Sequence, residues 1–312
     1  MIVFCGYANG DLTVSVPELP GPGARVQATA VRRGEGGMAA NASVAAARMG
    51  ADSRFAGVVG SDPLSTAFLQ TLAADGVDTA WTARTGTLTT AVVLLTPDGE
   101  RSIISQDDEV DGAHIEALAR TARAAGADWL YLDGYRFPEA ARLLDGLRGP
   151  GVPGGGRTGV VVDLDGADGA DAMRAALAAA DHAVVGRAQA TAALGGDEAL
   201  AAAAARYGVH LVVTDGARGW TLLAPDGTRH DGAAITVEAV DATGAGDCFA
   251  GTYCAELDRG AAPLDAARFA AVAAGLSCTR PGARDGMPRR ADVAAYIDAK
   301  APHLLTRSEG EE

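Results

Sequence analysis

Apolar and polar positions along this chain form short hydrophobic runs that alternate with alanine-rich segments. The hydrophobic runs predict strands over Ile2–Cys5, Ser53–Val59, Ala91–Thr96, Ser102–Ser105, Trp129–Leu132, Val160–Leu164, His182–Val185, Leu211–Thr214, Thr221–Ala224 and Ala234–Val240. The alanine-rich segments predict helices over Ala39–Met49, Ser65–Ala74, Ile115–Ala124, Ala170–Ala179, Glu198–Tyr207 and Cys248–Leu257. This alternation favours an α/β fold whose mainly parallel sheet is flanked by helices on both faces.

Ligands of such sheets bind outside the carboxyl ends of the strands. Asp11, Asp133, Asp163 and Thr214 follow apolar runs and are therefore expected at that edge. For Asp133 and Asp163 we favour a structural role in the turn.

Two stretches depart from the alternation because they contain no helical segment. Residues 12–34 carry a Pro/Gly turn, Pro17–Gly23, between extended sequences, and residues 87–106 resemble a hairpin that turns at Pro97-Asp98-Gly99. Gly149–Gly159 is rich in Gly and Pro and predicts a surface loop within one domain. Residues 1–300 are therefore expected to form a single domain, followed by a charged, disordered tail over 301–312.

The most informative segment is Asp241–Gly251, which reads DATGAGDCFAG. A glycine turn here leads into a helix, so the backbone N–H groups of Gly244, Ala245 and Gly246 are expected near a helix N-terminus. Such an end binds anions, because its donors lack intrahelical partners and the helix dipole adds positive charge. The carboxylate of Asp247 lies at the same turn. An anion cradle beside a carboxylate suits phosphoryl transfer, although Asp at this position is also a common helix cap.

A second polar group lies near the N-terminus. Paired glycines, Gly36 and Gly37, allow close approach of a ligand, and Asn41 near the start of the following helix offers donors and an acceptor to sugar hydroxyls. Asn9 and Asp11 are two residues apart, so an extended chain places both side chains on one face. Together these residues predict a polyhydroxylated ligand.

These motifs resemble those of the PfkB carbohydrate kinases, the ribokinase-like family. Gly36–Asn41, continued by Arg48–Ala51 and Gly57–Asp62, resembles the first family motif, and Asp241–Asp247 resembles the second. Asn9–Asp11 resembles the sugar-contacting motif, Thr214–Gly219 the nucleotide-binding turn, and Cys278–Ala283 the loop beside the nucleotide and a monovalent cation. The matches are collinear and cover almost the whole chain.

The resemblance implies a three-layer ribokinase-like fold with a small β-sheet lid over the sugar, built from residues 12–34 and 87–106. It also implies ATP-dependent phosphorylation of a sugar or sugar-acid hydroxyl, with Asp247 as base and Gly244, Ala245 and Gly246 as anion hole. The implied substrate contacts are Asn9, Asp11, Gly36, Gly37, Asn41 and Arg136. The implied nucleotide contacts are Thr214, Gly216 and Gly219. Mg²⁺ would come with ATP, and K⁺ would lie near Asp241, Thr243, Ser277 and Gly282.

Two departures from the family pattern bear on substrate and metal. Met38 stands where ribokinases carry lysine, and Gly186-Arg187-Ala188-Gln189 replaces the family's Asn-x-x-Glu motif. The Cys278–Gly282 loop is similar to that of the sulfofructose kinase branch, which phosphorylates an acidic sugar. Arg25, Arg101 and Arg136 are candidate anion contacts, but surface positions are favoured for each, and Ser105 replaces that branch's asparagine.

Composition narrows the function classes. A net charge of −14 argues against nucleic-acid binding. Lys300 is the one lysine of the chain, which excludes a Walker phosphate loop. The four cysteines, Cys5, Cys248, Cys254 and Cys278, form no Cys-x-x-Cys pair and suit reduced thiols in a cytoplasmic protein. We find no signal peptide and no apolar run that would span a membrane.

Three alternatives remain open. A nucleoside kinase of the same fold would need an aromatic shelf for the base, for which Tyr7 and Met38 are candidates. A non-catalytic sugar-binding protein would explain the missing Asn and Glu. A nicotinamide-dependent dehydrogenase would require a Gly-x-Gly-x-x-Gly fingerprint, which neither Gly6–Gly10 nor Gly244–Gly246 supplies. A homodimer through the lid edges is expected, since exposed strands recruit partners.

Overall fold

The computed structural model of the chain describes residues 1–97, 101–106, 109–148 and 157–300. An eight-stranded sheet forms its centre, in the order β12-β11-β10-β9-β8-β7-β1-β4. Its parallel strands are β1 (Ile2–Cys5), β4 (Ser53–Phe55), β7 (Trp129–Asp133), β8 (Gly159–Asp163), β9 (His182–Gly186) and β10 (His210–Thr214). β11 (Trp220–Leu223) and β12 (Arg229–Gly232) add an antiparallel edge.

Helices cover both faces of this sheet, and the side-chain alternation of β1 shows why. Ile2 and Phe4 belong to a buried cluster with α1 (Met38–Arg48), α8 (Ala245–Asp258) and α9 (Pro263–Ser277). Val3 and Cys5 face a second cluster with α3 (Gly112–Ala124), α4 (Glu139–Arg148), α5 (Gly169–Ala179) and α7 (Asp197–Tyr207). A strand that is apolar on both sides must be covered on both sides, so the three-layer α/β fold is confirmed.

The helices α1 and α8 pack unusually closely. A Cβ atom added to Gly251 in α8 would lie 2.1 Å from the carbonyl oxygen of Ala42 in α1. Only glycine therefore permits this approach. The contact fixes the first turn of α8 beside the first turn of α1, which is where the predicted Asp247 and Asn41 lie.

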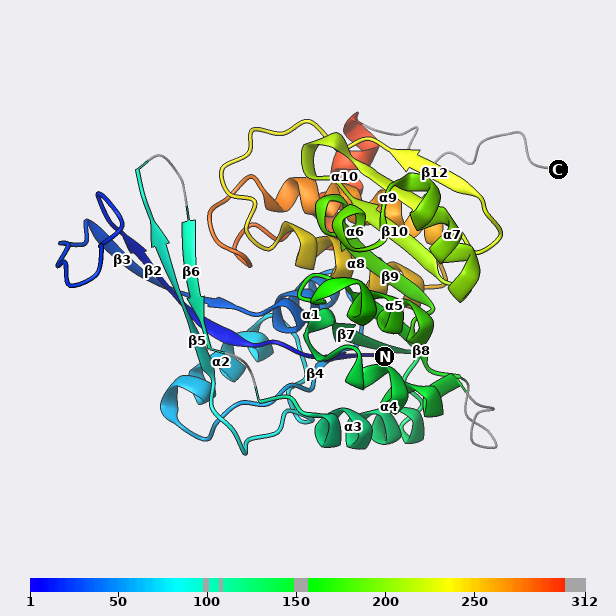
Figure 1. Cartoon of the computed structure of the whole chain (residues 1–312), viewed down its shortest axis with the longest axis horizontal. Helices are drawn as coiled ribbons and strands as arrows, with labels where there is room; N and C mark the ends of the chain where they lie inside the picture. Colours follow the sequence, from blue (N-terminus) through cyan, green and yellow to red (C-terminus); the bar gives the residue numbers. More distant parts are fainter. Residues whose placement is uncertain (98–100, 107–108, 149–156, 301–312) are drawn as a thin grey trace.

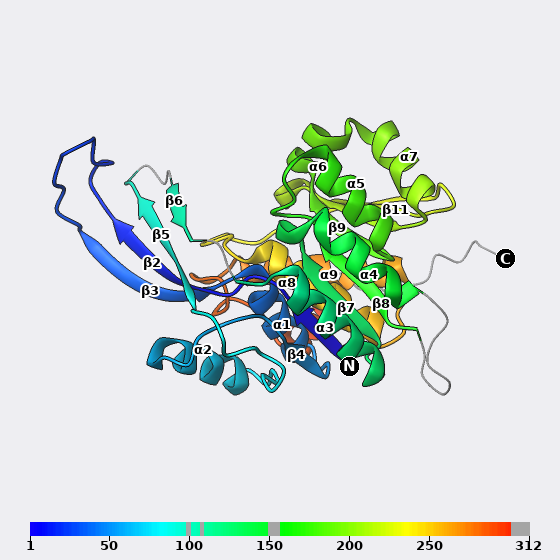
Figure 2. The ribbon, with the colours of Figure 1, turned by 60° about the horizontal axis from the view of Figure 1, so that its bottom comes forward.

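A second, four-stranded sheet projects from the main body as an arm (Figures 1 and 2). Its order is β3-β2-β5-β6, formed by β2 (Asn9–Ser15), β3 (Ala30–Gly36), β5 (Thr89–Leu95) and β6 (Arg101–Ser105). These strands come from the two stretches predicted to form the lid, and we call this sheet the lid. Residues Asp98–Gly99 of the predicted hairpin turn lie outside the described residues, as do 149–156 of the glycine-rich loop and the tail 301–312.

One predicted strand is wrong. Ala234–Val240 has the alternation of a strand but forms no ladder, and the preceding β12 ends the sheet at Gly232. The segment instead crosses onto α9, where a Cβ atom on Gly275 would lie 2.3 Å from Ile235. Alternation reports one buried side of an extended chain and not a hydrogen-bonded neighbour. The predicted strand over Ser53–Val59 is also shorter, because β4 ends at Phe55.

Several elements were not predicted from the sequence. They are α4, α6 (Arg187–Leu194), α9, α10 (Arg290–Lys300) and β12, besides the turns η1 (Gly134–Arg136) and η2 (Gly216–Arg218). The helix predicted over Ser65–Ala74 is α2 (Pro63–Ala74), capped by Asp62. Within the described residues, none of the helices has both the length and the apolar character to cross a membrane.

Candidate active site

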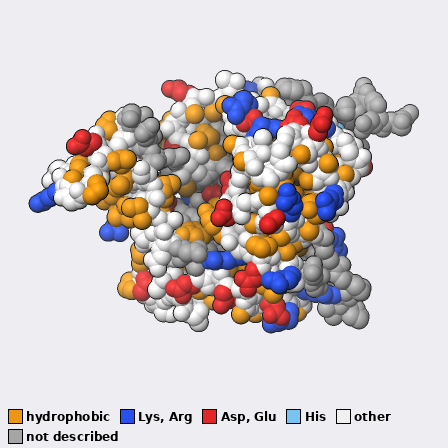
Figure 3. Space-filling view, viewed as in Figure 1, with side chains coloured by type: hydrophobic (Ala, Val, Ile, Leu, Met, Phe, Trp, Pro, Cys, Tyr) orange, Lys and Arg blue, Asp and Glu red, His pale blue; other side chains and the backbone are white. Residues whose placement is uncertain are grey.

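A cavity of about 1140 Å³ lies between the lid and the carboxyl edge of the main sheet. Figure 3 shows the hollow between the arm and the body. The cavity is lined by nine of the predicted site residues: Asn9, Asp11, Gly36, Gly37, Asn41, Asp241, Thr243, Gly244 and Asp247. Positions more than 230 residues apart in the sequence therefore meet at one place. Of the four residues expected at the strand edge, Asp11 lines the cavity from the lid strand β2, whereas Asp133, Asp163 and Thr214 do not line it.

Asp247 lies in the first turn of α8 and points toward α1. The Nδ2 group of Asn41, which is 4% exposed, donates a hydrogen bond of 2.8 Å to Oδ2 of Asp247. Burial raises the pKa of Asp247 to about 6, opposed by the Asn41 hydrogen bond and by Arg284. A carboxylate with a pKa near 6 is mostly ionised at neutral pH and still basic enough to accept a proton. Asp247 is thus suited to act as a general base.

The lid supplies a second pair of polar side chains. Asn9 Nδ2 donates to Asp11 Oδ1 at 2.5 Å, so both point to the same side of β2, as their spacing predicts. Asn9 pairs with Gly36 of β3, and a Cβ atom on Gly36 would lie 2.6 Å from Oδ2 of Asp11. Gly36 therefore leaves the space that these two side chains occupy, and burial raises the pKa of Asp11.

The glycine turn before α8 presents backbone donors to the cavity. Gly244 is the N-cap residue in a left-handed conformation, with φ 75°, and no side chain caps the helix. The Ala245 N–H already donates to the Ala242 carbonyl at 3.2 Å. Gly244 lines the cavity, so the N-terminal turn of α8 borders the space that an anion would occupy, whereas Ala245 and Gly246 do not line it.

The predicted cation residues lie on two adjoining loops. Asp241 accepts hydrogen bonds from the N–H groups of Thr243 and Gly282, both at 2.9 Å. The backbone of Asp241 also donates to Cys278 at 3.1 Å, directly after Ser277. The four residues are thus neighbours around one carboxylate, although Ser277 and Gly282 do not line the cavity.

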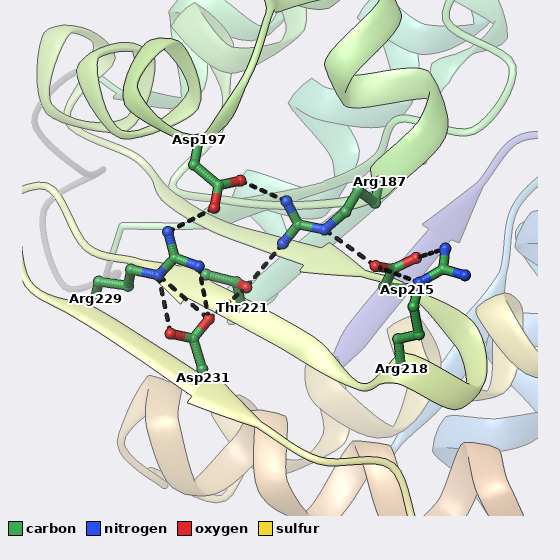
Figure 4. A network of polar contacts seen from close by, with 7 residues as sticks. All are labelled: Arg187, Asp197, Asp215, Arg218, Thr221, Arg229 and Asp231. Atoms are coloured by element: carbon green, nitrogen blue, oxygen red, sulfur yellow. Dashed lines mark hydrogen bonds and ion pairs between the residues drawn. The ribbon is translucent and has the colours of Figure 1, made fainter.

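The predicted nucleotide turn joins β10 to β11 at the same edge of the sheet. Thr214 ends β10, Gly216 begins η2, and Gly219 follows it. Asp215 within the turn forms an ion pair with Arg218 at 2.5 Å and with Arg187 at 3.3 Å. Figure 4 shows these contacts continuing to Asp197, Thr221, Arg229 and Asp231. The network links the turn to α6, α7 and β12, but Thr214, Gly216 and Gly219 lie outside the cavity lining.

Arg136 and Gln189, the last residue of the segment that replaces the Asn-x-x-Glu motif, both lie outside the cavity lining. Arg136 belongs to η1 and does not line the cavity, whereas its neighbour Tyr135 does. Gln189 donates to the carbonyls of Leu164 and Ala167 at 2.9 and 3.2 Å, so it supports the loop after β8. Asp165 lies on that loop close to Gly186. A Cβ atom added to Gly186 would lie 3.6 Å from Oδ1 of Asp165.

Asp133 and Asp163 take the structural role favoured above. Asp133, 1% exposed, accepts the Tyr7 N–H at 2.5 Å, and Asp163, 3% exposed, accepts the Asp165 N–H at 3.2 Å. Burial and the neighbouring carboxylates of Asp165 and Asp247 raise the pKa of Asp163. Both side chains hold the turns that deliver Tyr7 and Asp165 to the strand edge.

Sequence reasoning missed two residues of this site. Arg284 is 7% exposed and donates to Asn41, and Tyr135 packs against Tyr7 with ring centroids 5.1 Å apart. Arg284 follows directly after the loop that resembles the family's cation loop. A single arginine at that position belongs to no recognisable motif. Tyr135 follows β7 at the strand edge, and that position is the one signal in the sequence that points to it.

Comparison with known proteins shows the family to which the chain belongs. The model of the pfkB family carbohydrate kinases matches residues 1–290. The chain is similar to the ribokinase of Bacillus subtilis, with 29% identity over 305 residues, 95% of this chain and 99% of that protein. It is similar to the ATP-dependent ribose-1-phosphate kinase of Halopiger xanaduensis, with 28% identity over 302 residues, 96% and 98% of the two chains.

Solved structures agree on the fold. The ribokinase of Thermotoga maritima superposes with a TM-score of 0.80 at 24% identity, covering 96% of this chain and 99% of that one. The Arabidopsis thaliana ribokinase complexed with ribose and ATP has a TM-score of 0.76 at 22% identity, covering 98% and 99%. With a family model that spans nearly the whole chain and a matching fold, this protein belongs to the pfkB family of carbohydrate kinases.

Proposed function

We propose that this kinase transfers the γ-phosphoryl group of ATP to a hydroxyl of a sugar or sugar acid, with Asp247 as the general base. The observation that carries the proposal is the Asn41–Asp247 pair, which faces the cavity at the N-terminus of α8. A half-buried carboxylate, a helix N-terminus and a lid meet at this point. Together they combine a base with an anion cradle in a site that can exclude water.

The chemistry follows from these groups. The hydroxyl oxygen of the sugar bonds to the γ-phosphorus while the bond from phosphorus to the β-phosphate oxygen breaks, and the hydroxyl proton passes to Asp247. The N–H groups of Gly244 and Gly246 stabilise charge on the moving phosphoryl group. Asn9, Asp11 and Asn41 would hold the sugar hydroxyls. A lid that closes over the sugar excludes water, which would otherwise accept the phosphoryl group.

Magnesium would arrive on the triphosphate, whose charge it neutralises. Among the residues that the structure describes, no group of three or more His, Cys, Asp or Glu is placed to hold a metal ion. Asp165, whose carboxylate lies close to Gly186 and Gly246, would be the protein group available to a magnesium ion carried by the triphosphate.

We also propose that K⁺ binds between the two loops around Asp241 and stabilises the glycine turn at Gly244. The fit rests on the oxygen-rich character of the site, where the Asp241 carboxylate and neighbouring carbonyls are available. A cation there would hold the loop before α8 against the Gly282 loop, and hence the Gly244 donors in place.

Thr214, Gly216 and Gly219 are proposed to contact the nucleotide, because their turn opens on the same strand edge.

A second candidate function is phosphorylation of a nucleoside. The aromatic shelf it requires is present, because Tyr7 and Tyr135 both line the cavity with an interplanar angle of 36°. Tyr135 is 44% exposed, so part of its ring surface is accessible from the cavity. Accessible aromatic surface of this kind can contact a nucleobase or the apolar side of a sugar ring.

An ATP-to-ADP coupled assay over a substrate panel tests the function. The panel holds ribose, ribose 1-phosphate, fructose, 2-keto-3-deoxygluconate, sulfofructose, adenosine and inosine, with Mg²⁺ and K⁺ each omitted in turn. Turnover of a sugar that depends on Mg²⁺ is expected, and K⁺ omission should lower kcat. Turnover of nucleosides alone would select the second candidate. Ligands that raise the melting temperature without any turnover would indicate a non-catalytic sugar-binding protein.

We further propose a homodimer formed through the lid. The register places Leu12, Val14, Val31, Val92, Leu94 and Ile104 on the face opposite the cavity. Val31 is 59% and Ile104 64% exposed, and Figure 3 shows hydrophobic side chains gathered on the arm. An exposed apolar face of this kind marks an interaction site.

Sedimentation velocity tests this assembly. The unmodified chain should sediment as a dimer, and Val31→Glu with Ile104→Glu should give monomers, because charge would be buried at the contact. Leu64→Glu is the matched control, since Leu64 is an exposed apolar residue of α2 (49% exposed) outside the lid. A monomeric unmodified chain at micromolar concentration would contradict the dimer.

A further inference from the structure

Arg284 is a buried cation beside the proposed base. It lies in the loop between α9 and α10, is 7% exposed, and stacks over the Phe68 ring at 4.9 Å. Arg48 of α1 donates to the Arg284 carbonyl at 2.5 Å and to the Met287 carbonyl at 2.9 Å, so the loop is fastened to α1. A guanidinium that is removed from water loses its hydration free energy, so its hydrogen bonds and ion pairs must compensate for that loss.

Each arm of the Arg284 guanidinium reaches a residue next to the proposed substrate. Nε donates to Asn41 Oδ1 at 2.8 Å, and Nη1 pairs with Glu35 Oε2 at 2.9 Å. Nη2 donates to the Gly36 carbonyl at 3.2 Å. One side chain thus joins the cavity end of β3 to the first turn of α1, the two segments that line the cavity from this side.

The chemistry of an amide makes the Asn41 contact directional. A guanidinium has donors and no acceptor, so it can bind only the oxygen of the Asn41 amide. With Oδ1 committed to Arg284, the NH₂ group must point the other way, and it donates to Asp247 at 2.8 Å. A reversed amide would place its oxygen against the Asp247 carboxylate, where two acceptors repel. Arg284 therefore selects the amide orientation that holds the carboxylate.

We propose that Arg284 is a positioning residue of the phosphoryl-transfer site, which orients Asn41 so that its NH₂ group holds Asp247 toward the substrate hydroxyl. The inference rests on the proposed role of Asp247 and adds a residue that acts through Asn41 and does not itself line the cavity. The positive charge of Arg284 works in the same direction, because it lowers the pKa of Asp247 and of Asp11.

The pH profile separates positioning from simple stabilisation. In the unmodified protein the acidic limb of kcat/KM should lie near pH 6, because Asp247 must lose its proton to act as base. Without Arg284, the carboxylate loses a cation and an oriented donor, so its pKa rises and the limb moves to higher pH. The charged or titratable groups around Asp247 that stay unchanged in the variant include Asp11, Asp163, Asp165, Tyr131, Tyr135 and Cys248.

The experiment compares kcat and kcat/KM against pH for the unmodified protein, Arg284→Gln and Arg284→Lys. We expect Arg284→Gln to lower kcat by ~10–10², the loss that follows when a catalytic group is misplaced by about 1 Å, and to move the acidic limb upward. Arg284→Lys keeps the charge but not the planar fork, so it should restore the limb more than it restores kcat. An unmoved limb in folded Arg284→Gln would overturn the proposal.

Arg290→Gln is the matched control. Arg290 also pairs with a carboxylate, Glu256, and stacks over a ring, Phe269, at 4.7 Å. Glu256 lies near the opposite end of α8 from Asp247. Arg290→Gln should lower the melting temperature without moving the acidic limb. If Arg284→Gln does not fold, Asn41→Ala cuts the same link at its other end and should move the limb in the same direction.

A second readout needs no substrate. The side-chain amide of Asn41, assigned in ¹⁵N-edited NMR spectra by its loss in Asn41→Ala, should titrate with Asp247 in the unmodified protein. Its midpoint should rise in Arg284→Gln. If the amide titrates so but no sugar is phosphorylated, the proposed function fails while the positioning holds. An active enzyme whose midpoint is unchanged in Arg284→Gln would instead keep the proposed function and overturn the positioning role.

Discussion

Asp247→Asn is expected to lower kcat by ~10²–10⁴ while leaving the fold intact, because the substrate hydroxyl loses its proton acceptor. The substitution preserves shape, and the new amide oxygen still accepts the hydrogen bond that Asn41 donates at 2.8 Å. Removing a half-buried carboxylate from beside Asp165 should not destabilise the chain, because the two carboxylates repel each other. The measurement is kcat in the coupled assay, together with circular dichroism and the melting temperature.

Asp265→Asn is the control for this variant. Asp265 lies in the first turn of α9, as Asp247 does in α8, but its side chain is 49% exposed and pairs with Arg268 at 3.2 Å. An exposed pair of this kind contributes ~1 kcal/mol or less, so kcat should be unchanged. Equal activity of Asp247→Asn and the unmodified enzyme would rule out Asp247 as the base.

Gly244→Ala is expected to lower kcat by ~10²–10³, the effect of losing one preorganised donor to a developing anion. Gly244 has φ 75°, and a Cβ atom there would lie 2.7 Å from the Ala283 carbonyl. The turn must therefore move away from the Ala283 loop, and its N–H groups move with it. KM for the sugar should change little, since Asn9, Asp11 and Asn41 lie on other segments.

Gly260→Ala isolates the effect of backbone conformation. Gly260 follows the other end of α8 with φ 84°, and a Cβ atom there would meet nothing within 4 Å. Both variants carry the left-handed strain of a non-glycine residue, roughly 1–2 kcal/mol, but only Gly244→Ala adds the clash. Similar kcat values for the two variants would mean that the Gly244 turn does not stabilise the phosphoryl group.

The sequence predicted the layers well, because each layer leaves a local signature. Buried parallel strands are short apolar runs, as in Val160–Leu164, and the helices between them are long enough to recognise. Prediction was weaker where an element draws its stability from distant partners. Helix α9 was missed although it is long and packs in the core, and Ala234–Val240 kept a strand pattern without a strand partner.

The residues of the candidate site also fall into those that could be predicted from the sequence and those that could not. The resemblance to the family motifs grouped Asn9, Asp11, Asn41 and Asp247 into one site, and all four line one cavity. Arg284 and Tyr135 escaped prediction, because their roles are defined by contacts across long sequence separations. A guanidinium gives no sign in the sequence of whether it meets water or a buried amide.

By itself, then, the sequence determined the α/β class through local periodicity, and its family motifs predicted the lid segments and the polar residues of the cavity. Only the tertiary structure decided that the Ala245 N–H binds the Ala242 carbonyl and which way the Asn41 amide points. Those features depend on packing between α1, α8 and the Arg284 loop, where close approach and burial assign each donor to one acceptor.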